Sequence, residues 1–169
     1  MKNKHEQKLY SIIFPVWVML LLPWSWFVIL PVNLLIDSLV LLLIFRLLGI
    51  TGARKAYLSS VVRTWIFGTL SSLVGFLFML IAFLINRIAP EFVSPQVCTA
   101  ITQNPFSNII GLIWVLIAIA ISALCAYFFG LKFTFIGKDF PENRRKIAAL
   151  AIALITAPYT FLIPTVWFK

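Results

Sequence analysis

Long runs of apolar residues constrain this chain more than any other feature, because a soluble domain of this size could not bury them all. The 169 residues are 62% hydrophobic and only 11% charged, and the mean hydropathy is +1.04. Soluble domains average roughly 45–50% apolar and about 25% charged residues. Lipid must therefore replace water around much of the surface, which predicts an integral membrane protein with a single membrane domain, residues 1–169.

Five apolar segments follow one another along the chain. Each is close to the roughly 20 residues that a helix needs to cross a bilayer, and none shows the alternating pattern of barrel strands. We therefore expect an all-α, polytopic helical bundle with five transmembrane helices. The predicted spans are residues 11–30, 31–49, 62–85, 108–131 and 147–167, with an extracytoplasmic loop over residues 87–107.

The boundary between the first two spans is the least distinct, because residues 11–49 are almost continuously apolar. Pro31, in the stretch "LPVN", disfavours helix at the preceding residue and lacks a backbone donor. We interpret this stretch as the outer turn of a tight hairpin. In the alternative, residues 14–24 lie in the membrane interface and a single tilted span follows.

The distribution of basic residues predicts the orientation of the bundle. With a cytoplasmic N-terminus and five spans, Arg87 and Lys169 are the only lysines or arginines outside, which is a strong positive-inside bias. The C-terminus is then extracytoplasmic, and we expect the protein in the plasma membrane of a bacterium.

Basic residues in short clusters, rather than in a stripe, argue against nucleic-acid binding. Anionic lipid headgroups are the expected contacts of Arg54, Lys55, Arg144, Arg145 and Lys146.

The most unusual residue within a predicted span is Asp37, since a carboxylate in hydrocarbon is costly. Counting about 1.5 Å per residue from the cytoplasmic end of each span places several polar side chains at a similar, mid-membrane depth. Asn33 lies four residues before Asp37, on the same helix face. The candidate intramembrane polar site comprises Asp37, Asn33, Ser72, Ser122 and Tyr159.

Two predicted helix kinks, at Pro23 and Pro158, lie near the same depth. Each proline leaves the carbonyl four residues earlier without its helical donor. Broken helices beside a buried acid are typical of transporter sites. The alternative is structural, because prolines are common in membrane helices. In that interpretation Asp37 simply forms a hydrogen bond with Tyr159 or Arg87.

Small residues recur at four-residue spacing in three spans, which lets helix backbones approach closely. Packing within the bundle is the main interpretation. The alternative is a face that binds a second copy or another membrane protein. The motifs are Gly68 with Ser72, Ala118 with Ser122 and Ala126, and Ala149 with Ala153 and Ala157.

Chemical motifs are sparse. Neither Cys98 nor Cys125 belongs to a C-x-x-C pair, and the single histidine, His5, is far from both in the sequence. We therefore expect no metal and no cofactor. Cys98 is interpreted as a free thiol, with a disulfide between two chains as the alternative.

The sequence has no nucleophile elbow, no zinc-binding helix motif and no phosphate-binding glycine loop. We therefore expect no catalytic residues and no enzymatic activity.

Two classes of function agree with these features. The first is a non-enzymatic multi-pass membrane protein, an accessory or structural subunit that acts through helix–helix contacts. The second is a small oligomeric transporter or channel that uses the mid-membrane acid Asp37. A homo-oligomer or another membrane protein is the expected protein partner.

Overall fold

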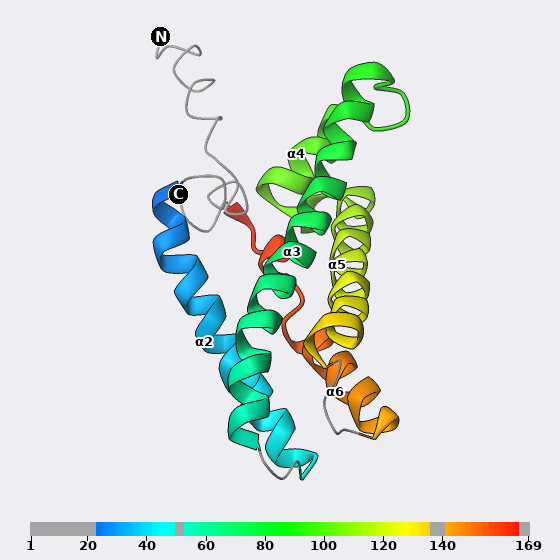
Figure 1. The fold of residues 1–169 in the computed structure, drawn as a ribbon. Coiled ribbons are helices and arrows are strands. Elements are labelled where there is room, and N and C mark those ends of the chain that lie inside the picture. The colour runs from blue at the N-terminus through cyan, green and yellow to red at the C-terminus, as the bar shows by residue number, and fades with distance from the viewer. Residues whose placement is uncertain (1–22, 50–52, 136–140, 166–169) are drawn as a thin grey trace.

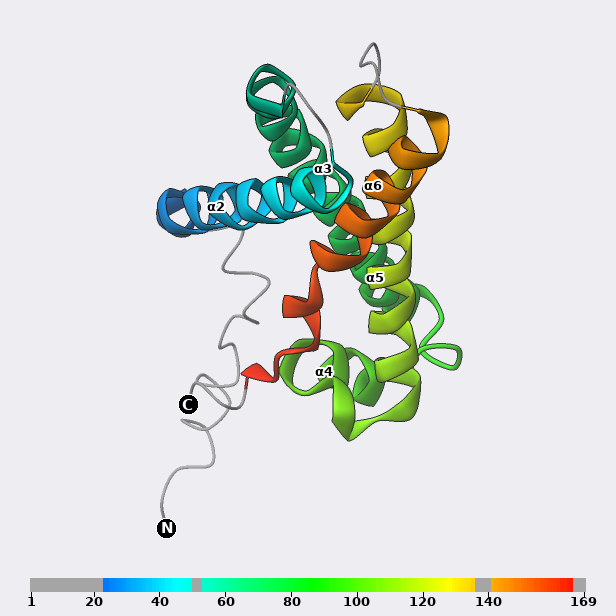
Figure 2. The ribbon, with the colours of Figure 1, turned by 90° about the horizontal axis from the view of Figure 1, so that it is seen from below.

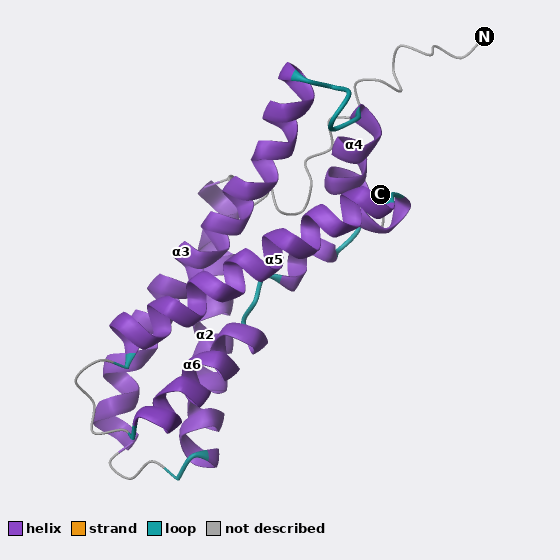
Figure 3. Cartoon of the chain, turned by 90° about the vertical axis from the view of Figure 1, so that its right-hand side faces the viewer, coloured by secondary structure: helices purple, strands orange, loops and turns teal. Residues whose placement is uncertain are grey.

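The computed structural model describes residues 23–49, 53–135 and 141–165, which form helices joined by short connections, with no strand among them (Figures 1 and 3). This confirms the predicted all-α class. Within these residues four helices are long and apolar enough to cross a membrane, whereas the sequence predicts five, and residues 11–22 of the first predicted span lie outside the described residues. The four candidate spans are Leu30–Leu47, Tyr57–Ile88, Ile109–Thr134 and Glu142–Leu162.

The long helices form an elongated bundle in which α2 and α3 run antiparallel, α5 packs against α3, and α6 packs against both α5 and the C-terminal half of α2 (Figures 1 and 2). The Pro23 end of α2 points away from the rest of the bundle in both views. In chain order the elements are α2 (Pro23–Leu47), α3 (Ala53–Ile88), α4 (Pro95–Gln103), the 3-10 turn η2 (Pro105–Ser107), α5 (Ile109–Phe129), the π-helical turn η3 (Gly130–Thr134), α6 (Glu142–Ile155) and the 3-10 turn η4 (Tyr159–Leu162).

Helix α2 continues through the stretch that was expected to form a hairpin turn, and Pro31 lies inside the helix. The predicted boundary between spans 11–30 and 31–49 is therefore wrong. Membrane helices tolerate proline where neighbouring groups supply polar contacts. The carbonyl that Pro31 leaves without its helical donor is that of Phe27. At the adjacent Leu30, the indole Nε1 of Trp65 on α3 donates a hydrogen bond to the carbonyl, 3.0 Å away, and ties this turn of α2 to α3. The alternative of a single span fits α2, and the segment before it lies outside the described residues.

The predicted outer loop contains an ordered helix, α4, that caps one end of the bundle. Ser94 is in the N-cap position and Pro95 follows at the start of the helix, a position that suits proline because its missing N–H would have no helical partner. The α4 backbone approaches α5 closely at Gly111, where an added Cβ would lie 2.7 Å from the Cβ of Ala100. The loop is therefore part of the packed structure.

The core divides into two clusters along the bundle. One joins α3, α4, α5 and η4 around Met79, Val115 and Phe161. The other joins α2, η3 and α6 around Phe45 and Phe135. Large apolar side chains elsewhere on these helices face outward, as a lipid solvent requires.

The small-residue faces lie mainly inside the bundle. Ala118, Ser122, Ala149 and Ala153 are each at most 1% exposed. An added Cβ at Gly130 would lie 3.3 Å from the Cβ of Ala149, so α6 packs closely against the end of α5. These faces therefore support packing within the chain rather than a surface for a partner.

Candidate functional site

Asp37 is buried between α2 and α3. Its side chain is 7% exposed, and its Oδ2 would lie 3.5 Å from a Cβ added at Gly68. The absence of a side chain at Gly68 leaves room for the carboxylate beside the α3 backbone. Within the described residues the carboxylate has no hydrogen bond or ion pair. The expected structural pairing with Tyr159 or Arg87 is not formed.

The Tyr159 hydroxyl binds a backbone carbonyl instead of Asp37. Helix α6 ends at Ile155, three residues before Pro158, so the predicted kink is instead a complete break. Proline disfavours helical backbone in the residue before it, which accounts for the early end. The Tyr159 hydroxyl donates to the carbonyl of Leu154 at 2.6 Å. Leu154 lies four positions before Pro158, and the carbonyl of Leu154 is the one expected to lack a helical donor.

The remaining polar residues of the candidate site separate into different environments. Ser72 donates to the carbonyl of Gly68 at 3.2 Å, so it lies on the turn of α3 that meets Asp37. Ser122 donates within α5 to Ala118 at 3.0 Å and faces Gly75. Gly75 is about 10 Å along α3 from Gly68.

Asn33 and the other predicted kink also lie away from the acid. Asn33 is exposed on α2, although it is only one turn from Asp37. Pro23 is the first residue of α2, and the turn before it is outside the described part of the chain. The structure thus joins Asp37 with the Gly68–Ser72 turn and does not gather all five predicted residues at one place.

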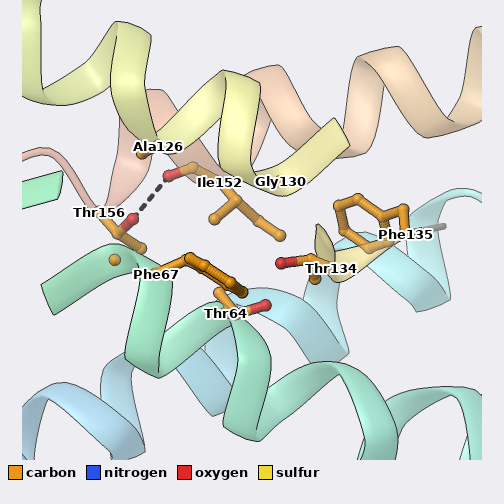
Figure 4. Close-up of a pocket in the computed structure, with 9 residues that line it drawn as sticks. Thr64, Phe67, Ala126, Gly130, Thr134, Phe135, Ile152 and Thr156 are labelled. Atoms are coloured by element: carbon orange, nitrogen blue, oxygen red, sulfur yellow. Dashed lines mark hydrogen bonds between the residues drawn. The ribbon is translucent and has the colours of Figure 1, made fainter. Parts of the chain in front are cut away.

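A small cavity that the sequence did not reveal lies beside this turn (Figure 4). It is lined by Gly68 and Thr64 of α3, by Thr134 of η3 and by Ile152 and Thr156 at the end of α6. Its volume, measured for the centre of a water-sized sphere, is about 10 Å³. This is room for about one water molecule or one small ion.

The cavity contains hydroxyl groups in apolar surroundings. Thr64 is 5% exposed and Thr134 is 1% exposed, and the close-up shows both side chains directed into the cavity. Thr156 donates to the carbonyl of Ile152 at 2.8 Å, whereas Thr64 Oγ1 has no hydrogen-bond partner among the described residues. A buried hydroxyl without a partner is costly, which marks this as a polar site.

The basic residues near one end of the bundle differ in their contacts. Arg144 Nη1 donates to the carbonyl of Leu48, just beyond α2, at 2.9 Å. Lys146 forms an ion pair with Glu142, 2.7 Å away. Arg145 has a buried Nε without a partner in the described part of the chain. The side chains of Arg54 and Lys55, predicted to contact lipid headgroups, lie outside the described residues.

Both cysteines are free thiols. Cys98 lies on the buried face of α4, with Sγ 3.8 Å from the carbonyl oxygen of Ala82 on α3. Burial raises the pKa of the Cys98 thiol, because the thiolate would lose its hydration. This environment favours the free-thiol interpretation over a disulfide between chains.

Comparison with protein families, curated proteins and solved structures finds no match for this chain. The fold defines the class, a bundle of apolar helices compatible with a membrane protein. The function must be argued from the site itself.

Proposed function

We propose that this protein is a non-enzymatic, multi-pass protein of a bacterial plasma membrane that conducts or transports a small monovalent cation. The observation that carries the proposal is the buried Asp37 carboxylate, which has no hydrogen bond or ion pair within the described residues. A buried carboxylate needs a counter-charge or a proton. A cation that passes along α2 and α3 would supply it, and intramembrane acids commonly mark such pathways.

The break after α6 supports the same proposal. Residues 156–158 leave the helical conformation in the middle of the candidate span Glu142–Leu162. Non-helical backbone at membrane depth is tolerated where it is buried in protein or lines a cavity, and transporters use helix ends of this kind to bind ions. Thr156, at this break, lines the cavity beside Gly68.

The proposed cation carries a single charge because Asp37 is the only acid near the cavity within the described residues. Divalent ions in proteins generally have several oxygen ligands, often including more than one carboxylate. The proposed assembly is an oligomer, since the cavity lined by three of the four described candidate spans has room for only about one water molecule.

The direct test is ion flux in proteoliposomes that contain the full chain. We expect Asp37→Asn to lower the flux of sodium ions or protons by about tenfold or more, because the substitution keeps the shape but removes a charge at an intramembrane site. Ser122→Ala is the matched control, since Ser122 is also a buried polar residue but faces Gly75. A wild-type protein without flux, or flux indifferent to Asp37→Asn, would exclude the proposal.

An accessory subunit is the second candidate function, favoured by one observation. Asn33 is exposed on α2, in the half of the helix that diverges from the bundle (Figure 2). An amide that faces lipid gains from a hydrogen bond to another helix. We expect Asn33→Leu to weaken co-purification with a partner or a second copy in mild detergent. A monomer without partners, unchanged by the substitution, would exclude this role.

In either role, we propose that the loop between α2 and α3 and the loop before α6 lie on the cytoplasmic side. Positive charge on these loops agrees with the positive-inside rule. Anionic headgroups would then meet Arg54, Lys55, Arg144, Arg145 and Lys146.

A further inference from the structure

We infer that the cavity between α3, η3 and α6 is a binding site for a single monovalent cation of the size of sodium, coordinated by threonine hydroxyls with Asp37 as the counter-charge. The inference rests on the proposed function and specifies where the cation binds. The starting observation is the Thr64 hydroxyl, which is buried, directed into the cavity and without a partner among the described residues.

The cavity has the ligand chemistry of a hard cation. Three threonines, Thr64, Thr134 and Thr156, are among its nine lining residues. Thr156 donates its proton to the carbonyl of Ile152, so the lone pairs of its oxygen stay available to a cation. Hydroxyl and carbonyl oxygens suit hard cations rather than soft metals. A volume of about 10 Å³ for the centre of a water-sized sphere matches one small ion without its hydration shell.

Two helix ends add favourable electrostatics. Thr134 lies at the end of the π-helical turn that terminates α5, and Thr156 directly follows the last residue of α6. The C-terminal end of a helix carries partial negative charge on its carbonyl groups. Because both ends contribute to the lining of one cavity, their dipoles attract a cation and disfavour an anion.

Asp37 supplies the full negative charge. Gly68 lines the cavity and is also the glycine that meets the Asp37 carboxylate. Position 68 carries no side chain, and Asp37 is not itself among the lining residues. The nearest basic group in sequence to Thr64 is Arg63, which is exposed and donates to the carbonyl of Phe133, the residue before Thr134, at 3.2 Å. Solvent therefore screens its positive charge.

Sodium binding by the purified full chain in detergent tests the inference, because it requires no transmembrane ion gradient and no transport. Equilibrium binding of radioactive sodium should saturate, and unlabelled sodium should compete better than potassium or choline. Saturating sodium should also raise the unfolding temperature, as expected for a ligand that binds only the folded state. Failure to find saturable sodium binding to the wild-type protein would overturn the proposed site.

Substitutions locate the site. Thr64→Val keeps the shape of the side chain but removes a ligand, and we expect affinity to fall about tenfold or more. Ser122→Ala, the matched buried hydroxyl outside the cavity, should leave affinity unchanged. Gly68→Ala adds a methyl group in ordinary contact with Asp37, so it tests the site even where Thr64→Val does not fold. Unchanged sodium affinity in both Thr64→Val and Gly68→Ala would place the ion elsewhere and overturn the inference.

Binding and flux distinguish this inference from the proposed function. Sodium binding that depends on Thr64, in a protein without flux, would support the site and exclude the transport role. Flux that depends on Asp37 but does not change in Thr64→Val would support transport and exclude this site.

Discussion

Tyr159 shows how one side chain can compensate for a proline. Pro158 cannot donate a backbone hydrogen bond, and the Tyr159 hydroxyl reaches the carbonyl of Leu154 instead. We expect Tyr159→Phe to lower the free energy of unfolding by about 1 kcal/mol, the usual net contribution of such a bond. Reversible unfolding in mixed micelles measures it. Tyr127→Phe is the control, because Tyr127 forms a ring contact with Phe128 and no hydrogen bond within the described residues. Equal losses in both variants would contradict the role of Tyr159.

The raised pKa of Cys98 predicts a pH dependence. The folded protein holds the thiol proton more tightly than the unfolded chain, so stability falls as the pH rises above about 8.5, the ordinary thiol pKa. Below that pH both states are protonated, and the thiol adds no pH dependence. The rate of alkylation of Cys98 in a Cys125→Ala variant reports the pKa directly. An alkylation midpoint equal to that of the SDS-unfolded variant would contradict the burial of this thiol.

Local chemistry at single residues was predictable, whereas partners across helices were not. The freed carbonyl at Leu154 follows from proline itself and is where the sequence places it. The setting of Asp37 depends on Gly68 of another helix. Counting depth along each span places Ser72 near the level of Asp37, on the turn that meets it, but it does not reveal that Ser122 faces Gly75 instead. The threonine cavity also depends on η3, and a π-helical turn has no clear signature in this sequence.

Among the described elements, α3 and α5 form the most extensive contact, and Gly75 lies in it. A Cβ added at Gly75 would overlap Ser122 Oγ and would lie 2.8 Å from the carbonyl oxygen of Ala118. We expect Gly75→Ala to lower the free energy of unfolding by about 1–3 kcal/mol, as overpacking usually does. Gly68→Ala is the matched control, since its Cβ would meet only Asp37, at 3.5 Å. Unfolding curves with a larger loss for Gly68→Ala would contradict the packing described for α3 and α5.

Helix α2 shows why element boundaries were harder to predict than element type. Its apolar composition predicts a helix, which is confirmed, and it contains one of the four candidate membrane spans of the described residues. Pro31 suggests a turn when only local backbone rules are considered. The hydrogen bond from the Trp65 indole to the carbonyl of Leu30 ties α2 to α3 next to Pro31. It is a tertiary contact, which local backbone rules do not predict.

At the scale of the whole molecule, the continuity of α2 changes the expected topology. The Pro23 end of α2 lies at the same end of the bundle as α4 (Figure 1). Of the first predicted span, residues 11–22 precede α2, and a helix of that length would extend only about 18 Å, less than the roughly 30 Å of hydrocarbon. We therefore predict that Lys2, Lys4 and Lys8 lie on the extracytoplasmic side with Glu91, in contrast to the five-span topology.

Labelling of single cysteines with a membrane-impermeant maleimide in intact cells tests this topology. The background carries Cys98→Ser and Cys125→Ala. Glu91→Cys, in the exposed outer loop, should be labelled in intact cells, and Asn143→Cys, exposed in the first turn of α6, only after permeabilisation. Asn3→Cys distinguishes the two topologies, because four spans predict that it is labelled like Glu91→Cys. Labelling of Asn3→Cys only after permeabilisation would show that the chain before α2 crosses the membrane, as the five-span interpretation requires.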